Sequence, residues 1–127
     1  SLGDRLVFRA DREGKVSLFG DMEEIAWDES NLIYQAALAL KKTAGVKQGV
    51  AIEVKKIIPP GRGLGGGSSN AAVTLMALNR LWGLNLPTRQ LIHLGAFLGA
   101  DAQEARRLSR CLSRLRRRHG RAFHGAR

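Results

Sequence analysis

The sequence is poor in several residue types, and each shortage excludes a class of protein. Its 127 residues include one cysteine, Cys111, so it has neither an internal disulfide framework nor a cysteine-rich zinc site. Its three histidines, His93, His119 and His124, are too scattered for the spacing of metal ligands. No apolar run approaches the roughly 18 residues of a membrane span. No segment resembles a signal peptide, so we expect one ordinary, cytoplasmic domain.

Charge is unevenly distributed along the chain. The net charge is +10, yet residues 1–101 carry only +2, whereas residues 102–127 carry +8 from nine arginines, one glutamate and no lysine. The high pI therefore belongs to a C-terminal tail, and electrostatics alone does not indicate what the remainder binds. Hydrophobic residues make up 44% of the sequence, which is enough for a packed core.

Apolar periodicity predicts a mixed α+β fold. Residues 5–10 and 15–19 alternate apolar and polar side chains, and residues 11–14 between them have turn composition, so we expect a β-hairpin. A further strand is expected over residues 49–58, because Pro59 and Pro60 cannot continue a sheet ladder. Strands and helices do not alternate regularly, which favours α+β over a doubly wound sheet.

Helical spacing and end signals predict three helices before residue 101. The expected helices are one capped by Asp28 or Ser30 and stopped by Gly45, one capped by Ser68, Ser69 and Asn70 and running through Trp82 to Gly83, and one from Pro87 and Thr88 to Gly99.

The most informative segment is residues 59–72, PPGRGLGGGSSNAA, between an expected strand and an expected helix. Glycines let backbone N–H groups approach a ligand closely, and a helix start adds unpaired N–H donors and the positive end of its dipole. The hydroxyls of Ser68 and Ser69 are suited to phosphate oxygens or Mg²⁺. No acidic residue occurs between Glu53 and Asp101, which favours a multiply charged anion. A flexible linker is the alternative, but Leu64 and the tight flanking elements disfavour it.

Three common nucleotide-binding motifs fit this segment poorly. Gly61, Gly63 and Gly66 match the dinucleotide fingerprint, but no acid follows about 20 residues later to bind the ribose. A Walker A loop requires lysine after its last glycine, whereas Ser68 follows Gly67 here. A protein-kinase glycine loop is followed by a strand with a VAIK-like lysine, which is absent.

A fourth motif fits well. Residues 59–72 resemble the phosphate-binding motif of the GHMP small-molecule kinases. Residues 31–33 (NLI), 78–82 (LNRLW) and 98–101 (LGAD) also resemble elements of that family, so the resemblance covers about residues 1–101. It implies part of an N-terminal GHMP-kinase domain, with the ribosomal protein S5 domain 2-like fold and a mixed sheet packed by helices.

The resemblance also implies a reaction and its residues. The triple glycine before SSNAA is most similar to the branch that uses ATP to phosphorylate a cytidine diphosphate-linked methylerythritol in the non-mevalonate isoprenoid pathway. Asp101 corresponds to the family's proposed catalytic base, and Ser68 and Ser69 would contact phosphate oxygens and Mg²⁺. The role of Arg62 stays open. The residues expected to bind the phosphates of ATP are Pro59, Pro60, Gly61, Arg62, Gly63, Leu64, Gly65, Gly66, Gly67, Ser68 and Ser69.

The sequence also departs from the family pattern. Members begin with an AKxN-type strand that carries a catalytic lysine and a GYH segment that holds cytosine, and this sequence starts downstream of both. After LGAD the family continues with VPFF-like residues, whereas AQEARRL follows Asp101 here. We therefore expect an inactive fragment, with a truncated ATP-binding domain over residues 1–101 and an Arg-rich tail over residues 102–127.

Two interpretations of the tail stay open. Ala105, Leu108, Leu112 and Leu115 have 3-4-3 spacing, which predicts a basic amphipathic helix that binds nucleic acid or an anionic surface. In that alternative, the chain is a nucleic-acid-binding module acting through residues 102–127. The other interpretation is out-of-frame translation of a GC-rich gene, giving a disordered or helical segment without a selected function.

Overall fold

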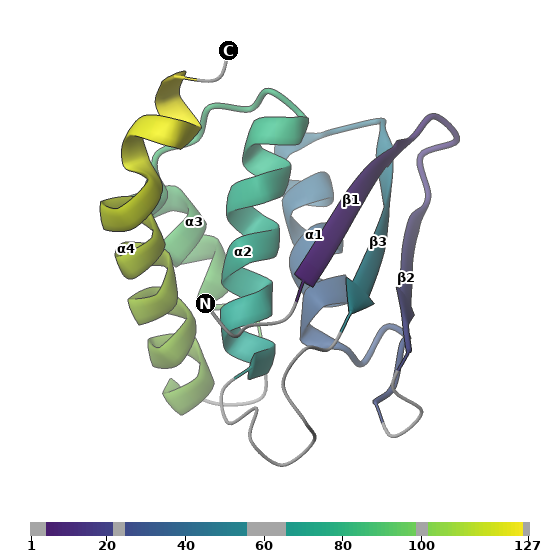
Figure 1. Cartoon of the computed structure of the whole chain (residues 1–127), viewed down its shortest axis with the longest axis horizontal. Helices are drawn as coiled ribbons and strands as arrows, with labels where there is room; N and C mark the ends of the chain where they lie inside the picture. The colour runs from purple at the N-terminus through teal and green to yellow at the C-terminus, as the bar shows by residue number, and fades with distance from the viewer. Residues whose placement is uncertain (1–4, 22–24, 56–65, 99–101, 126–127) are drawn as a thin grey trace.

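The computed structural model describes residues 5–21, 25–55, 66–98 and 102–125, and these confirm the expected α+β fold class (Figure 1). In chain order the elements are β1 (Arg5–Asp11), β2 (Val16–Gly20), α1 (Leu32–Ala44), β3 (Gly49–Lys55), α2 (Gly66–Leu81), α3 (Thr88–Gly95) and α4 (Ala102–Gly125). The strands form one mixed sheet, and Figure 1 shows the helices on one side of it, with α2 between α4 and the sheet.

The prediction that the first two strands pair as a β-hairpin is wrong. The sheet order is β1-β3-β2, with β3 antiparallel to β1 and parallel to β2. The turn itself forms, since the Gly14 N–H donates to the Asp11 carbonyl at 3.3 Å and the Glu13 N–H donates to the Asp11 carboxylate at 2.7 Å. The chain therefore reverses direction at residues 11–14, as the turn composition predicts. However, β1 and β2 each pair with β3 and not with each other.

The physical reason lies in the composition of β3. Val50, Ile52 and Val54 are completely or almost completely buried, so this strand gains most from the central position, where both of its edges are paired. Gly49 permits the insertion, because a Cβ there would overlap the backbone of Gly14 and Lys15. A glycine at this point lets β3 enter the sheet directly beside the turn.

The N-cap of helix α1 lies one residue after Ser30 and three residues after Asp28, the two expected capping residues. Asn31 is its N-cap: the side-chain oxygen accepts from the Ile33 N–H at 2.9 Å, and the side-chain amide donates to the Ala26 carbonyl at 2.9 Å. Asp28 and Ser30 instead bond to each other in the preceding turn. The predicted stop at Gly45 is confirmed, and its φ of 67° explains the glycine.

Helix α2 is buried on most of its circumference. Ala71, Ala72, Leu75 and Leu78 have no exposed surface and lie within about 120° of the helix circumference, and the buried Thr74 and Met76 widen this arc to about 200°. Thr74 is also fully buried, and its hydroxyl is satisfied by donating to the Asn70 carbonyl at 2.8 Å. The helix packs against α1, α4 and β1, which accounts for this burial.

The boundaries of α2 and α3 differ from those expected. α2 starts at Gly66, two residues before Ser68, so the three predicted capping residues lie inside its first turns. Glycine has a low helix propensity, and the rest of α2 packs against α1 and α4. α3 ends at Gly95, and residues 96–98 form turns rather than a continuation to Gly99, which lies outside the described residues.

The Arg-rich tail forms helix α4, which packs on α2 and α3. Leu108 and Leu112 are 1% and 0% exposed and belong to the same core cluster as α1, α2 and β3. Gly95 of α3 allows the close approach, since a Cβ there would lie 2.6 Å from Cδ2 of Leu108. The predicted 3-4-3 spacing thus corresponds to a core-facing side of the helix.

Replacing Leu112 by alanine tests whether α4 is an integral part of the core. Because the side chain is fully buried, Leu112→Ala should lower the free energy of unfolding by about 2–5 kcal/mol in urea denaturation. The exposed Arg114 of the same helix supplies the control, and Arg114→Ala should change it by less than about 0.5 kcal/mol. Equal effects of the two substitutions would contradict packing of this helix face.

Candidate functional site

The described residues on either side of the connection between β3 and α2 lie at one end of the fold. β3 finishes at Lys55 and α2 begins at Gly66, and Figure 1 shows these two points at the same end of the molecule. The described elements on either side of the connection are the end of the central strand and a helix N-terminus, as the sequence predicts. A helix start supplies backbone N–H donors that have no partner within the helix.

Only part of the predicted phosphate-binding set can be placed. Gly66, Gly67, Ser68 and Ser69 form the first turn of α2, and Ser69 is exposed. The other predicted residues lie outside the described part of the chain, and these are Pro59, Pro60, Gly61, Arg62, Gly63, Leu64 and Gly65. The roles assigned to all of these residues stay predictions.

Three helix N-termini lie at this end of the molecule. α1, α2 and α4 all begin at the end where β3 finishes (Figure 1). Each N-terminus carries about half a positive elementary charge. The first turns of α1 and α2 contain no acidic residue, whereas that of α4 contains Glu104. The start of α2 is therefore favourable for an anion, although the charge of residues 1–101 is near neutral.

The predicted catalytic base, Asp101, directly precedes a described helix in the sequence. Asp101 lies outside the described residues, but the next residue, Ala102, begins α4. α4 packs beside α2 and runs in the same direction (Figure 1). The topology therefore brings the start of α4 and the start of α2 to the same end of the fold.

Near the start of α1, Asp28 is held in a local network. The Ser30 hydroxyl donates to its carboxylate at 2.6 Å, and the Ser30 N–H donates at 2.9 Å. Both hydrogen bonds lower the pKa of Asp28 below its ordinary value, and the bond from the Ser30 hydroxyl has the larger effect. The carboxylate therefore stays ionised and occupied with the turn that precedes the Asn31 cap.

The segment after α2 has an anchor that the sequence analysis missed. The side-chain oxygen of Asn79 accepts from the Leu86 N–H at 2.9 Å, and its amide donates to the Leu86 carbonyl at 2.9 Å. Asn79 lies in the LNRLW segment, residues 78–82, and the sequence alone did not indicate a role for its side chain. Its two bonds close the turn between α2 and α3, so they fix α2 at the end remote from the glycine-rich loop.

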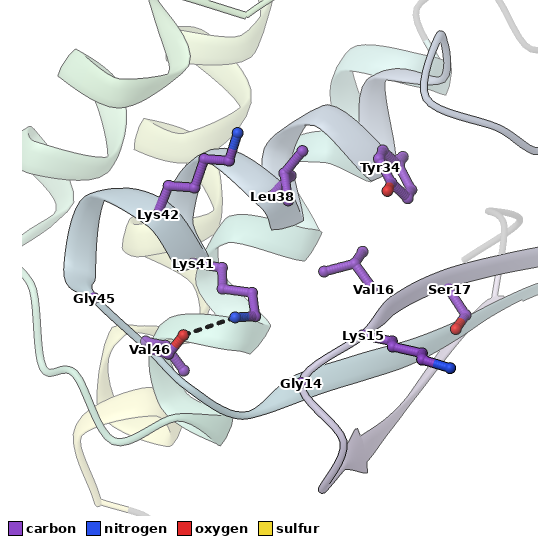
Figure 2. A pocket seen from close by; sticks show the side chains of 10 residues that line it. All are labelled: Gly14, Lys15, Val16, Ser17, Tyr34, Leu38, Lys41, Lys42, Gly45 and Val46. Atoms are coloured by element: carbon purple, nitrogen blue, oxygen red, sulfur yellow. Dashed lines mark hydrogen bonds between the residues drawn. The ribbon is translucent and has the colours of Figure 1, made fainter.

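A groove of about 650 Å³ lies at the opposite end of the fold, between the start of β2 and the C-terminal end of α1. Figure 2 shows Val16 and Lys41 facing each other across it, with the Lys41 ammonium donating to the Val46 carbonyl at 2.9 Å. Its lining residues include three lysines but no carboxylate. The sequence analysis missed it, because Lys15 lies in the turn before β2 whereas Lys41 and Lys42 lie in α1.

Comparison with known proteins supplies the family. The model of the GHMP kinases N terminal domain matches residues 31–121, from the N-cap of α1 through most of α4. The chain belongs to the GHMP kinase family. The resemblance found in residues 59–72 is therefore confirmed at the level of the family.

Curated relatives specify the similarity further. The chain is 52% identical over 99 residues to a 4-diphosphocytidyl-2-C-methyl-D-erythritol kinase of Burkholderia mallei (strain SAVP1), covering 78% of this chain and 33% of the relative. It is 47% identical over 98 residues to the kinase of the same name from Shewanella denitrificans, covering 77% of this chain and 34% of that one. The chain thus spans about one third of the length of these relatives.

Solved structures show the same fold. The chain superposes on a crystal structure of 4-(cytidine 5'-diphospho)-2C-methyl-D-erythritol kinase with a TM-score of 0.60 and 40% identity, covering 80% of this chain and 35% of that chain. It also superposes on homoserine kinase from Cytophaga hutchinsonii with a TM-score of 0.64 and 25% identity, covering 84% and 33%. The GHMP kinase fold therefore extends over most of the residues described.

Proposed function

We propose that the chain is the ATP-binding part of a GHMP kinase that phosphorylates a hydroxyl of 4-diphosphocytidyl-2-C-methyl-D-erythritol. The observation that carries the proposal is the start of α2 within the glycine-rich segment, at the end of the fold where β3 finishes and α1 and α4 also begin. Phosphoryl transfer depends mainly on positioning and charge neutralisation, and a set of helix N-termini supplies both.

The residues at the start of α2 fit the phosphates of ATP. Gly66 and Gly67 carry no side chain that would keep a ligand from the backbone N–H groups, and no acid lies in this turn to repel it. In this proposal Ser68 and Ser69 contact phosphate oxygens and Mg²⁺. The magnesium ion, when bound, neutralises charge on the transferring phosphoryl group.

Asp101 is the proposed catalytic base. Its carboxylate would accept the proton of the substrate hydroxyl or orient that hydroxyl for attack on the γ-phosphorus. The beginning of α4 directly after Asp101, beside the beginning of α2, supports this role. Asp101→Asn is therefore expected to spare nucleotide binding while removing the base.

The proposed substrate rests on sequence rather than on fold. Homoserine kinase shares the fold at 25% identity, so the fold alone does not select an acceptor. The 52% identity to a 4-diphosphocytidyl-2-C-methyl-D-erythritol kinase favours the cytidine diphosphate-linked acceptor. Residues that would bind cytosine are not among those assigned in this sequence.

Nucleotide binding tests the site in the purified chain. Gly65→Val, which adds a side chain to the loop, and Ser68→Ala should each weaken MgATP binding about tenfold or more, equivalent to about 1.4 kcal/mol, in isothermal titration calorimetry. Ser17→Ala in the groove at the opposite end of the fold is the matched control and should leave the affinity unchanged. Loss of affinity in the groove variant, with both loop variants unaffected, would refute the loop as the nucleotide site.

Turnover is a separate matter, and we expect none from the 127-residue chain in a coupled kinase assay. The chain spans about one third of its relatives, and the AKxN-type segment with the family's catalytic lysine does not occur in its sequence. Preorganised positive charge of that kind is often the largest catalytic contribution. Turnover near that of a full-length relative would show that the missing lysine is not required.

A further inference from the structure

Helix α4 has two faces of different chemistry. One face contains Leu108 and Leu112, which are buried against α2 and α3. The other carries exposed arginines, and we call the following five the arginine face: Arg106, Arg107, Arg110, Arg114 and Arg117. At 3.6 residues per turn these five lie within about 100° of the helix circumference, opposite the buried leucines, over a length of about 16 Å.

The arginine face has few carboxylates near it. The elements that α4 packs against, α2 and α3, contain no acidic residue, because none occurs between Glu53 and Asp101. Within α4 itself the sequence supplies a single acid, Glu104. Arginines of the face also follow one another at spacings of three and four residues, and like charges at these spacings destabilise a helix. Burial of the leucines therefore holds together a helix whose outer face repels itself.

From this arrangement we propose that the arginine face binds the phosphodiester backbone of a nucleic acid without regard to base sequence. Guanidinium groups are planar, permanently charged and suited to paired hydrogen bonds with phosphate oxygens. Residues 102–118 of α4 include no aromatic side chain that would stack on bases, so we expect the contacts to be with phosphates. This inference is independent of the proposed kinase function.

The structure disfavours a membrane as the partner. A basic amphipathic helix binds a bilayer by inserting its apolar face between the lipid headgroups. In α4 that face is occupied, since Leu108 and Leu112 are buried in the core of the same chain. Membrane attachment in that mode would require α4 to leave the fold, whereas phosphate binding uses the face that is already exposed.

The first measurement is salt-dependent binding of the full 127-residue chain to labelled nucleic acids of random sequence, followed by fluorescence anisotropy. The two probes are a single-stranded RNA of about 20 nucleotides and a DNA duplex of about 20 base pairs. Five phosphate contacts predict slopes of log K against log salt of about −3.5 for the single strand and about −4.5 for the duplex. Affinity should therefore fall about 100- to 500-fold between about 50 and 200 mM salt. A slope near zero would overturn the proposal.

Two quadruple variants with equal net charge separate the arginine face from general charge. The first replaces Arg106, Arg110, Arg114 and Arg117 by glutamine, and the second replaces the exposed Arg12, Lys42, Lys47 and Arg89 by glutamine. The first should bind at least about 30-fold more weakly and lose about three units of slope on the single strand, whereas the second should stay within about threefold. Equal weakening by both variants would overturn the proposal.

Single variants and vesicles complete the test. Arg114→Gln should leave the far-ultraviolet circular dichroism spectrum of the chain unchanged. It should reduce the slope of log K against log salt by about the contribution of one phosphate contact. This result does not depend on whether the quadruple variant folds. Vesicles of phosphatidylcholine with about 30% phosphatidylserine should bind more weakly than either nucleic acid. Binding to these vesicles with no binding to nucleic acid would refute the proposal in favour of a lipid surface.

Discussion

The burial of α2 is the constraint on which the other features depend. Its alanines and leucines contact α1, α4 and the sheet at once, so this helix cannot shift without disturbing every layer. Asn79 fixes the far end of the helix to Leu86. The opposite end, Gly66 to Ser69, therefore has a fixed position relative to the end of β3. A phosphate-binding loop needs such fixed ends, because its affinity comes from N–H groups that are already oriented.

The same packing produces two cationic regions of different origin. At the end where β3 finishes, positive potential comes from the backbone dipole of α2, whose first turn contains no acidic residue. On the outer side of α4, positive potential comes from arginine side chains. They are exposed because the leucines on the opposite face of the helix are buried in the core. The first suits one polyphosphate, whereas the second is a longer surface suited to a polymer of phosphates.

Much of the fold followed from sequence because local patterns determine local structure. Apolar alternation located the three strands, and Gly45 marked the end of α1. The sheet order did not follow, because β3 enters between β1 and β2 through a long-range fit at Gly49. The cap of α1 was missed because Asp28, Ser30 and Asn31 all have capping side chains, and only the bonds among them decide which one acts.

The residues of the candidate site were predictable from the sequence, but their arrangement in space was not. Residues 59–72 indicated the family, because their spacing of glycines and serines is specific. That α1, α2 and α4 begin at the same end of the fold was not predictable, because it depends on how α1 and α4 pack against α2. The spacing of leucines in residues 102–127 predicted a helix, and its packing against α2 needed the structure. An out-of-frame origin of these residues stays a prediction that the downstream nucleotide sequence tests.

The central claim is that the loop before α2 holds the phosphates of ATP. A titration of the ¹⁵N-labelled chain with MgATP, followed by amide chemical shifts, tests it most directly. The account predicts that the largest shifts fall on Gly63, Gly65 and residues 66–69, with small changes at Lys15, Lys41 and Lys42 in the groove. Largest shifts in the groove or along α4, with the loop amides unchanged, would contradict it.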